Sequence, residues 1–119
     1  MLKSFCFFNT VDEWGGGERW HLDMALYLRF KGHRVMVITQ PGAVLGERAQ
    51  KQDIVVFNIV LNNLSVLNPF VLHKLANIFR SNMVDTVVLN LSRDLSKFHQ
   101  YWPRELIKQR YQLHFVYLV

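Results

Sequence analysis

The sequence predicts an α/β fold in which a parallel sheet of about five strands carries helices on both faces. Short apolar runs of strand length alternate with segments of helical periodicity along the whole chain. Such alternation is typical of parallel strands joined by right-handed crossover helices. The 119 residues, 50% hydrophobic and 19% charged, suffice for one domain with a buried core and exclude global disorder. We therefore expect a single Rossmann-like three-layer sandwich over residues 1–119.

The first half of the chain predicts strands that alternate with two helices. Leu2–Phe8 is an apolar, aromatic run typical of a strand buried on both faces, and a polar, glycine-rich loop follows it. Glu18–Lys31 contains good helix formers, with an acid in the first turn, bases in the last, and Gly32 as a terminator. The next expected elements are a strand at Arg34–Thr39, a helix at Val44–Gln52 and a strand at Ile54–Val60.

The second half continues the alternation after an irregular, asparagine-rich connection at Leu61–Asn68. Pro69 suits the first turn of a helix that runs to Ser81. A strand at Val84–Asn90, a helical region over about Asp94–Arg110 and a last strand at Leu113–Val119 complete the pattern. An apolar last strand without a covering helix is an exposed edge, so we expect a fragment of a longer protein or a domain that docks on another.

Composition limits the cellular compartment in which the protein is expected and the classes of partner that it could bind. The apolar start of the chain ends at Asn9, too early for a signal peptide, and one cysteine cannot form an internal disulfide. We expect a cytoplasmic protein with Cys6 as a buried apolar side chain. The net charge of +5 suggests an anionic partner, which could be nucleic acid, an anionic membrane or a phosphorylated small molecule, or else it serves only the solubility of the protein. The absence of a dense Lys/Arg block argues against nucleic acid.

Polar and glycine residues follow the expected strands at their carboxyl ends, where ligands bind in open α/β sheets. The strongest signal is Gly15–Gly17, which leads from a strand into a helix. Glycine lets a ligand approach the main chain, and free N–H groups at a helix start favour phosphate, although a tight connection is the simpler alternative. The sequence does not match the dinucleotide-binding fingerprint, because Trp20 occupies a position that needs a small residue. It does not match the P-loop either, because Lys31-Gly32 has the lysine and glycine of that motif in the opposite order.

The residues around these glycines resemble a known family. Gly15–Arg19, an amphipathic helix and then Lys31–His33 are similar to the opening of family-4 (group 1) glycosyltransferases. Thr39–Gly42, Glu47–Ala49 and Ser92–Asp94 match later segments of that family more weakly. The resemblance implies the GT-B fold, with this chain as the N-terminal, acceptor-side half and the C-terminal donor-binding domain absent.

The resemblance also implies an activity and its site. The whole enzyme would transfer a sugar from a nucleotide-sugar donor, which is a co-substrate, to a saccharide or lipid-linked acceptor with retention of configuration, without a cofactor or an active-site metal. Gly15, Gly16 and Gly17 match the loop that faces the donor phosphates. The acceptor-side candidates, from the ends of the first and fourth strands, are Asn9, Thr10, Asp12, Glu13, Asn90, Ser92, Arg93 and Asp94. The catalytic base stays unassigned, because Leu89–Leu91 lacks the histidine that many members have there.

Two alternatives remain open. The stretch from Arg93 to Tyr111 mixes basic and aromatic residues and could rest on an anionic membrane, or it could be a solvated helix with a buried aromatic face. The whole domain could also be a non-catalytic Rossmann-like domain that binds a nucleotide or a partner. Of the histidines, we expect His33 to pack between a helix and a strand, His21 to be exposed or satisfied, and none to bind a metal.

Overall fold

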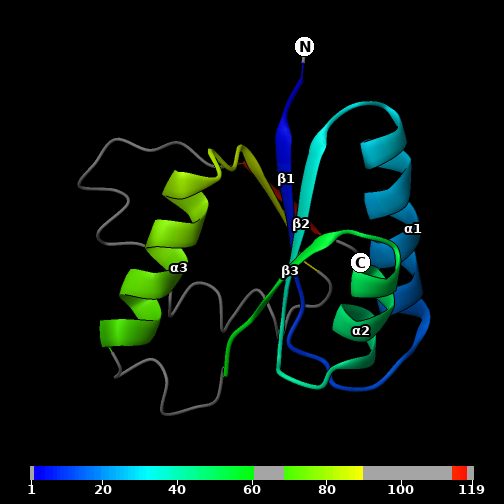
Figure 1. Ribbon diagram of the computed structural model, residues 1–119, viewed down its shortest axis with the longest axis horizontal. Coiled ribbons are helices and arrows are strands. Elements are labelled where there is room, and N and C mark those ends of the chain that lie inside the picture. Colours follow the sequence, from blue (N-terminus) through cyan, green and yellow to red (C-terminus); the bar gives the residue numbers. More distant parts are fainter. Residues whose placement is uncertain (1, 61–68, 90–113, 118–119) are drawn as a thin grey trace.

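The computed structural model describes residues 2–60, 69–89 and 114–117. The elements, in chain order, are β1 (Ser4–Phe8), α1 (Gly16–Phe30), β2 (Arg34–Thr39), α2 (Val44–Lys51), β3 (Val55–Asn58), α3 (Pro69–Ser81), β4 (Thr86–Leu89) and β5 (His114–Tyr117) (Figure 1). The strands form one sheet in the order β3-β2-β1-β4-β5, and every neighbouring pair is parallel. The predicted parallel α/β fold is confirmed. The helix expected over 94–110 lies outside the described residues.

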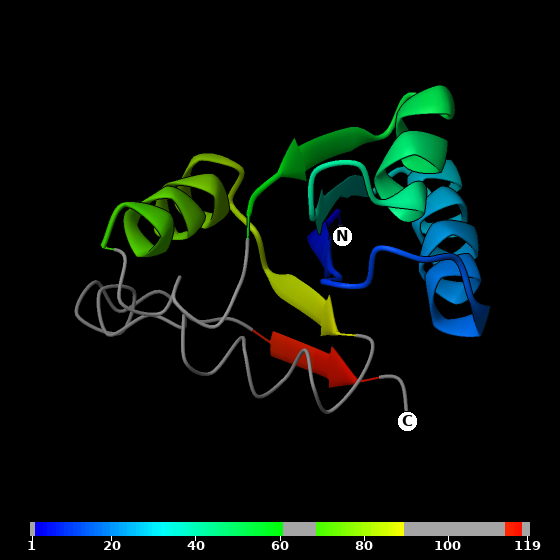
Figure 2. The same cartoon turned by 90° about the horizontal axis from the view of Figure 1, so that it is seen from below.

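Helices cover both faces of the sheet, so the predicted three-layer sandwich is also confirmed (Figure 2). Successive β1 side chains point to opposite faces. Phe7 packs with Ala25 of α1 and Leu45 of α2 on one face, whereas Phe8 packs with Phe79 of α3 on the other. Cys6 is fully buried, as expected, and burial raises the pKa of its thiol.

The position of β1 determines where a ligand can bind. β1 pairs with β2 on one side and with β4 on the other, so the strand order reverses at β1. The carboxyl ends of the parallel strands share one rim, at the lower end of Figure 1. In open α/β sheets, ligands generally bind at a reversal of this kind, between the two connections that leave the sheet in opposite directions. The β1–α1 loop crosses the rim at this point.

Helix α1 begins two residues earlier than the sequence indicated, at Gly16 instead of Glu18. Gly15 is the N-cap in an extended conformation, and its carbonyl accepts the first helical hydrogen bond from the Arg19 N–H at 3.0 Å. Glycine is a poor helix former, which is why the pattern placed Gly16 and Gly17 in the loop. The far end agrees with the prediction, because Gly32 has φ +92° after the last turn.

Candidate functional site at the start of helix α1

The glycine segment lies at the rim of the sheet, at the N-terminus of α1. Gly15 and Gly16 are exposed, and Gly17 is partly exposed. The first N–H groups of a helix have no partner within the helix, and here no acceptor among the described residues takes those of Gly15–Gly17. A Cβ at Gly16 would meet nothing within 4 Å. Within the described part of the chain, the first turn of α1 therefore has main-chain donors without a protein acceptor, at the positive end of the helix dipole.

A buried polar cluster, formed by Asn9, Glu18 and His21, lies beneath this turn. The Asn9 Nδ2 donates to Glu18 Oε2 at 3.1 Å and lies 3.3 Å from His21 Nδ1. The Asn9 Oδ1 accepts from the Val11 N–H at 2.8 Å. Because this last bond identifies the oxygen of the amide, the NH₂ group must face Glu18 and His21. The end of β1 is thereby tied to the first two turns of α1.

His21 was expected to be exposed or satisfied; it is not exposed, and of its two ring nitrogens Nδ1 has a hydrogen-bond partner, the Asn9 amide. Its side chain is fully buried and packs edge-on against the Phe7 ring, with centroids 5.3 Å apart. Since Nδ1 accepts from Asn9, the neutral ring carries its proton on Nε2. That atom has no well-aligned partner among the described residues. Burial lowers the pKa of His21 to about 4, and the nearby Leu89 carbonyl opposes this shift in part.

Two contacts attach the β1–α1 loop to α2. The Asp12 carbonyl accepts from the Val44 N–H at 3.1 Å, at the start of α2. The Arg48 guanidinium lies 4.1 Å from the centre of the Trp14 ring, within the range of a cation–π interaction. These contacts leave the side chains of Asp12 and Glu13 exposed. The loop is anchored at its middle while its acidic side chains face solvent.

The structure separates the predicted acceptor-side residues into three groups. Asp12 and Glu13 are exposed on the loop, next to the glycine segment. Asn9 and Thr10 are buried, at 0% and 6% exposure, and the Asn9 side chain is used in the polar cluster. The remaining candidates, Asn90, Ser92, Arg93 and Asp94, lie outside the described residues. Glu18 and His21 were missed, because only the fold reveals that polar residues of α1 face β1.

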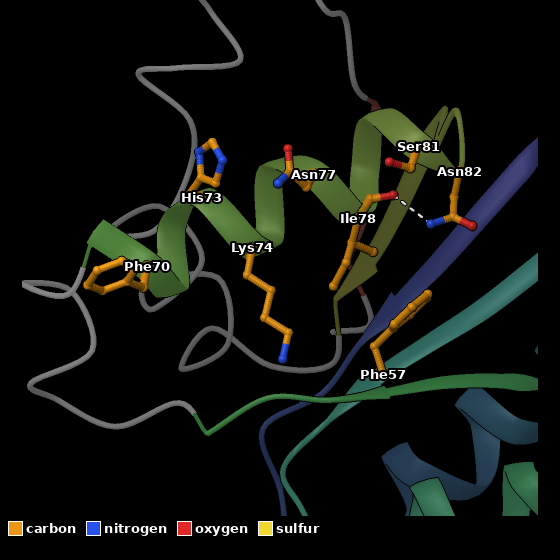
Figure 3. A pocket seen from close by; sticks show the side chains of 8 residues that line it. All are labelled: Phe57, Phe70, His73, Lys74, Asn77, Ile78, Ser81 and Asn82. Carbon is orange, nitrogen blue, oxygen red and sulfur yellow. Dashed lines mark hydrogen bonds between the residues drawn. The ribbon is translucent and has the colours of Figure 1, made fainter.

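A concavity of about 360 Å³ lies between α3 and β3, away from the glycine segment (Figure 3). Phe57 faces α3 from β3, and Lys74 extends from α3 toward β3. Phe70 and Asn82 lie toward its two ends, and Asn82 Nδ2 donates to the Ile78 carbonyl. Since β3 is an outer strand among the described strands, this groove lies between α3 and an edge of the sheet.

Metal ligands and membrane spans were sought in the described part of the chain. Within residues 2–60, 69–89 and 114–117, no three His, Cys, Asp or Glu side chains cluster as a metal site would require. The helices described there include none with the length and apolar character needed to cross a membrane.

Comparison with known proteins identifies the fold. No family model matches the chain, and no curated protein matches it in sequence. In structure it is similar to a glycosyltransferase from Rickettsia africae, with a TM-score of 0.72 and 20% identity over 98% of this chain and 29% of that one. HepE from Anabaena, solved in complex with UDP and glucose, is similar with a TM-score of 0.67. The sequence identity is 18%, over 97% of this chain and 29% of HepE. MurG from Acinetobacter baumannii is similar with a TM-score of 0.56 and 18% identity, over 76% of this chain and 28% of MurG.

These likenesses define the class of fold. The chain is a Rossmann-like α/β domain that matches a GT-B domain. It spans less than a third of the length of each of these proteins, with 29%, 29% and 28% covered. Identities of 18–20% relate the folds and leave the activity of this chain to be argued from its own residues.

Proposed function

We propose that this chain is the N-terminal, acceptor-side domain of a family-4 (group 1) glycosyltransferase with the GT-B architecture. The whole enzyme transfers a sugar from a nucleotide-sugar donor to a saccharide or lipid-linked acceptor, with retention of configuration. The fold similarity and the GGGER segment, Gly15–Arg19, support this assignment together. A C-terminal domain that binds the donor nucleotide would complete the site, and in this proposal it packs over the carboxyl rim of the sheet.

The observation that carries the proposal is the open N-terminus of α1. Gly16 and Gly17 lie at the rim where the strand order reverses, their N–H groups meet no acceptor among the described residues, and an added Cβ at Gly16 would meet nothing within 4 Å. When the glycosidic bond to the donor breaks, negative charge develops on the leaving diphosphate. Preorganised main-chain donors and a helix dipole stabilise such charge. In this role the glycine segment binds the donor diphosphate across a cleft from the C-terminal domain of the whole enzyme.

The exposed acidic residues of the loop fit the acceptor side. Asp12 and Glu13 project into solvent beside the glycine segment. Carboxylates accept hydrogen bonds from sugar hydroxyls, so the two can orient an acceptor, and the anchors at Asp12 and Trp14 limit the movement of the loop. We assign no catalytic base.

The proposed location follows from the substrate class. We place the protein in the cytoplasm, and a lipid-linked acceptor would bring it to the inner face of the membrane. The basic and aromatic stretch after Arg93 is the proposed contact with anionic lipid. The transfer itself uses no cofactor or metal in this proposal.

The test is transfer by the intact gene product against a panel of nucleotide-sugars, with the Gly16→Leu variant beside it. The added Cβ meets nothing within 4 Å in the folded domain, and in this proposal the rest of the leucine side chain obstructs the approach of the diphosphate to the α1 amides. We expect normal folding and a loss of transfer of at least about a hundredfold, as for removal of oxyanion donors. Gln50→Leu, which adds the same side chain on an exposed position of α2, serves as the control.

Two outcomes contradict the proposal. Full activity of Gly16→Leu would remove the glycine segment from the mechanism. Nucleotide binding without transfer to any acceptor, in a protein with no second domain, would favour the non-catalytic Rossmann-like domain instead.

A further inference from the structure

Three large apolar side chains are exposed where the strands of the sheet begin, at the end opposite to the glycine segment. Leu2 precedes β1 and is 73% exposed, Phe30 ends α1 at 85%, and Met83 lies between α3 and β4 at 71%. The start of the chain and the C-terminal ends of α1 and α3 lie at the upper end of Figure 1. We call this surface, formed by residues 2–3, 30–34 and 82–83, the amino rim.

The start of β1 contacts the turn after α1. The Lys3 N–H donates to His33 Nδ1 at 3.0 Å. A Cβ at Gly32 would lie 3.4 Å from Leu2 Cδ2, so the Leu2 side chain lies against this turn. Because Gly32 is only two residues after Phe30, the exposed side chains of Leu2 and Phe30 belong to the same part of the surface.

The turn between α3 and β4 borders the same surface. The Arg34 Nη1 donates to the Asn82 carbonyl at 3.4 Å, directly before Met83, and the Asp85 N–H donates to the Ser4 carbonyl at 2.9 Å. Met83 has φ +50°, a backbone conformation that favours glycine or asparagine after a helix. Neither burial nor backbone conformation therefore accounts for a large apolar side chain at this position.

Basic side chains accompany these apolar groups on the amino rim. Lys3, Lys31 and Arg34 are exposed, and none of them makes an ion pair within the part of the chain that the structure describes. The nearby acidic residues are Asp53, on the turn before β3, and Asp85, which accepts a hydrogen bond from the main chain at the start of β1. The rim therefore combines exposed apolar side chains with an excess of positive charge.

This combination favours an anionic phospholipid surface over a nucleic acid. Apolar side chains are stabilised when they enter the boundary between headgroups and acyl chains, whereas the backbone of a nucleic acid binds only the charges. Basic side chains next to them are attracted to anionic headgroups. The aliphatic stems of lysine and arginine reach from the apolar boundary to the headgroup phosphates.

We propose that the amino rim docks on an anionic phospholipid membrane, with its three apolar side chains at the boundary of the acyl chains and Lys3, Lys31 and Arg34 at the headgroups. The glycine segment, at the opposite end of the strands, then faces away from the lipid and stays accessible to a second domain. This inference goes beyond the proposed function: it requires no transfer of a sugar, and its surface is distinct from the stretch after Arg93.

Co-sedimentation of the full chain with lipid vesicles tests the proposal. We expect binding to vesicles of equal parts phosphatidylglycerol and phosphatidylcholine, and little binding to phosphatidylcholine alone. Phe30→Gln should weaken the binding about tenfold, and Lys31→Gln about fivefold. Both side chains are exposed, so the variants should fold normally, which thermal unfolding checks.

Two matched controls make the same changes away from the amino rim. Phe70→Gln removes an aromatic side chain that is 81% exposed at the start of α3. Arg19→Gln removes a positive charge from an exposed side chain near the start of α1, at the opposite end of that helix from Phe30. We expect both controls to bind the anionic vesicles nearly as well as the unmodified chain.

A probe at position 30 measures whether this residue enters the lipid. The chain contains one cysteine, Cys6, which is fully buried and whose thiol pKa is raised by burial, so a new surface cysteine can be labelled selectively. A polarity-sensitive fluorophore on Phe30→Cys should shift its emission to the blue when anionic vesicles are added. The same fluorophore on Phe70→Cys should not shift.

Several outcomes would overturn the inference. One is the absence of binding to anionic vesicles, and another is equal binding to the neutral vesicles. If substitution of the basic residues after Arg93 abolishes binding while Phe30→Gln binds normally, the membrane contact of the proposed function stands and the amino rim has no part in it. If Phe30→Gln dissociates a dimer of the chain in the absence of vesicles, the rim is an interface between copies instead.

Failure of the proposed function gives a different result. A chain whose intact gene product transfers no sugar, but which binds anionic vesicles through Phe30 and Lys31, would contradict the transferase assignment and support the amino rim as a membrane surface.

Discussion

The imidazole of His21 is enclosed between β1 and α1, where a second proton would put a charge in the protein interior. Burial holds its pKa at about 4, against an ordinary value of 6.5. The Asn9 NH₂ group next to Nδ1 also disfavours protonation of that nitrogen, since a donor faces a donor. His21 therefore stays neutral throughout the physiological range.

This environment predicts a loss of stability in mild acid. Above pH 6.5 the ring is neutral in the folded and in the unfolded protein, so its protonation does not change the free energy of unfolding. Below pH 6.5 the unfolded chain binds the proton first, and the free energy of unfolding falls until the pH reaches about 4. The total loss from this residue is about 3 kcal/mol. Denaturant unfolding between pH 7 and pH 4 measures this loss. The free energy of unfolding should depend less steeply on pH in His21→Gln than in the unmodified protein. Equal slopes in the two proteins would refute the assignment.

The Arg48–Trp14 contact predicts a second effect at the residue scale. Arg48→Met keeps most of the aliphatic stem but loses the charge over the ring, so we expect a loss of about 0.5–1 kcal/mol and a looser loop. Equilibrium unfolding measures the loss of stability, and the rate of proteolysis at the β1–α1 loop measures how much looser the loop has become. Arg19→Met is the control: its partner Asp23 is 3.9 Å away and both side chains are exposed, so the loss should be close to zero. A loss as large for Arg19→Met would contradict this account.

At the scale of elements, Gly46 sets how closely α2 packs on the sheet. A Cβ at Gly46 would lie 2.6 Å from Thr39 Oγ1 and 3.5 Å from Val56 Cγ1. The Thr39 hydroxyl donates to Asn58 Oδ1 at 3.2 Å, so it is not free to turn away. A larger residue must push α2 off β2 and β3.

We expect Gly46→Ala to destabilise the domain by about 1–3 kcal/mol, as overpacking does. Equilibrium unfolding in urea measures the change. Gly16→Ala is the matched control, because its added Cβ meets open space, and the change should stay within about 0.5 kcal/mol. Equal effects of the two substitutions would show that helix propensity, and not packing, decides the result.

At the scale of the whole molecule, the sheet ends on one side at β3, which pairs only with β2 among the described strands. Val55 on this strand is 53% exposed. An open edge with an exposed apolar side chain can pair with another chain.

Val55→Lys should therefore reduce self-association, which analytical ultracentrifugation at several concentrations measures. Tyr27→Lys is the control, since Tyr27 is 54% exposed on α1 and receives the same charge away from the edge. An equal reduction of self-association in both variants would mean that net charge, and not the open edge at β3, controls self-association.

The elements could be predicted because each depends on neighbours in the sequence. The apolar run before Asn9, the helical spacing before Gly32 and the proline at the start of α3 are local signals, and the observed elements follow them. The start of α1 could not be placed, because glycine propensity argues against a helix that the sheet and the polar cluster impose at Gly16. Tertiary context overrides propensity at such positions.

The sequence alone determined the class of the fold and the position of the glycine segment at the carboxyl end of a strand, since periodicity and connection order require only local information. Only the tertiary structure decided that Asn9, Glu18 and His21 meet beneath that segment. Their contact depends on how α1 packs against β1, and a polar residue on a helix has no pattern that tells whether it faces solvent or a partner. The burial of the Glu18 carboxylate beneath the first turn of α1 is therefore a property of the packed domain.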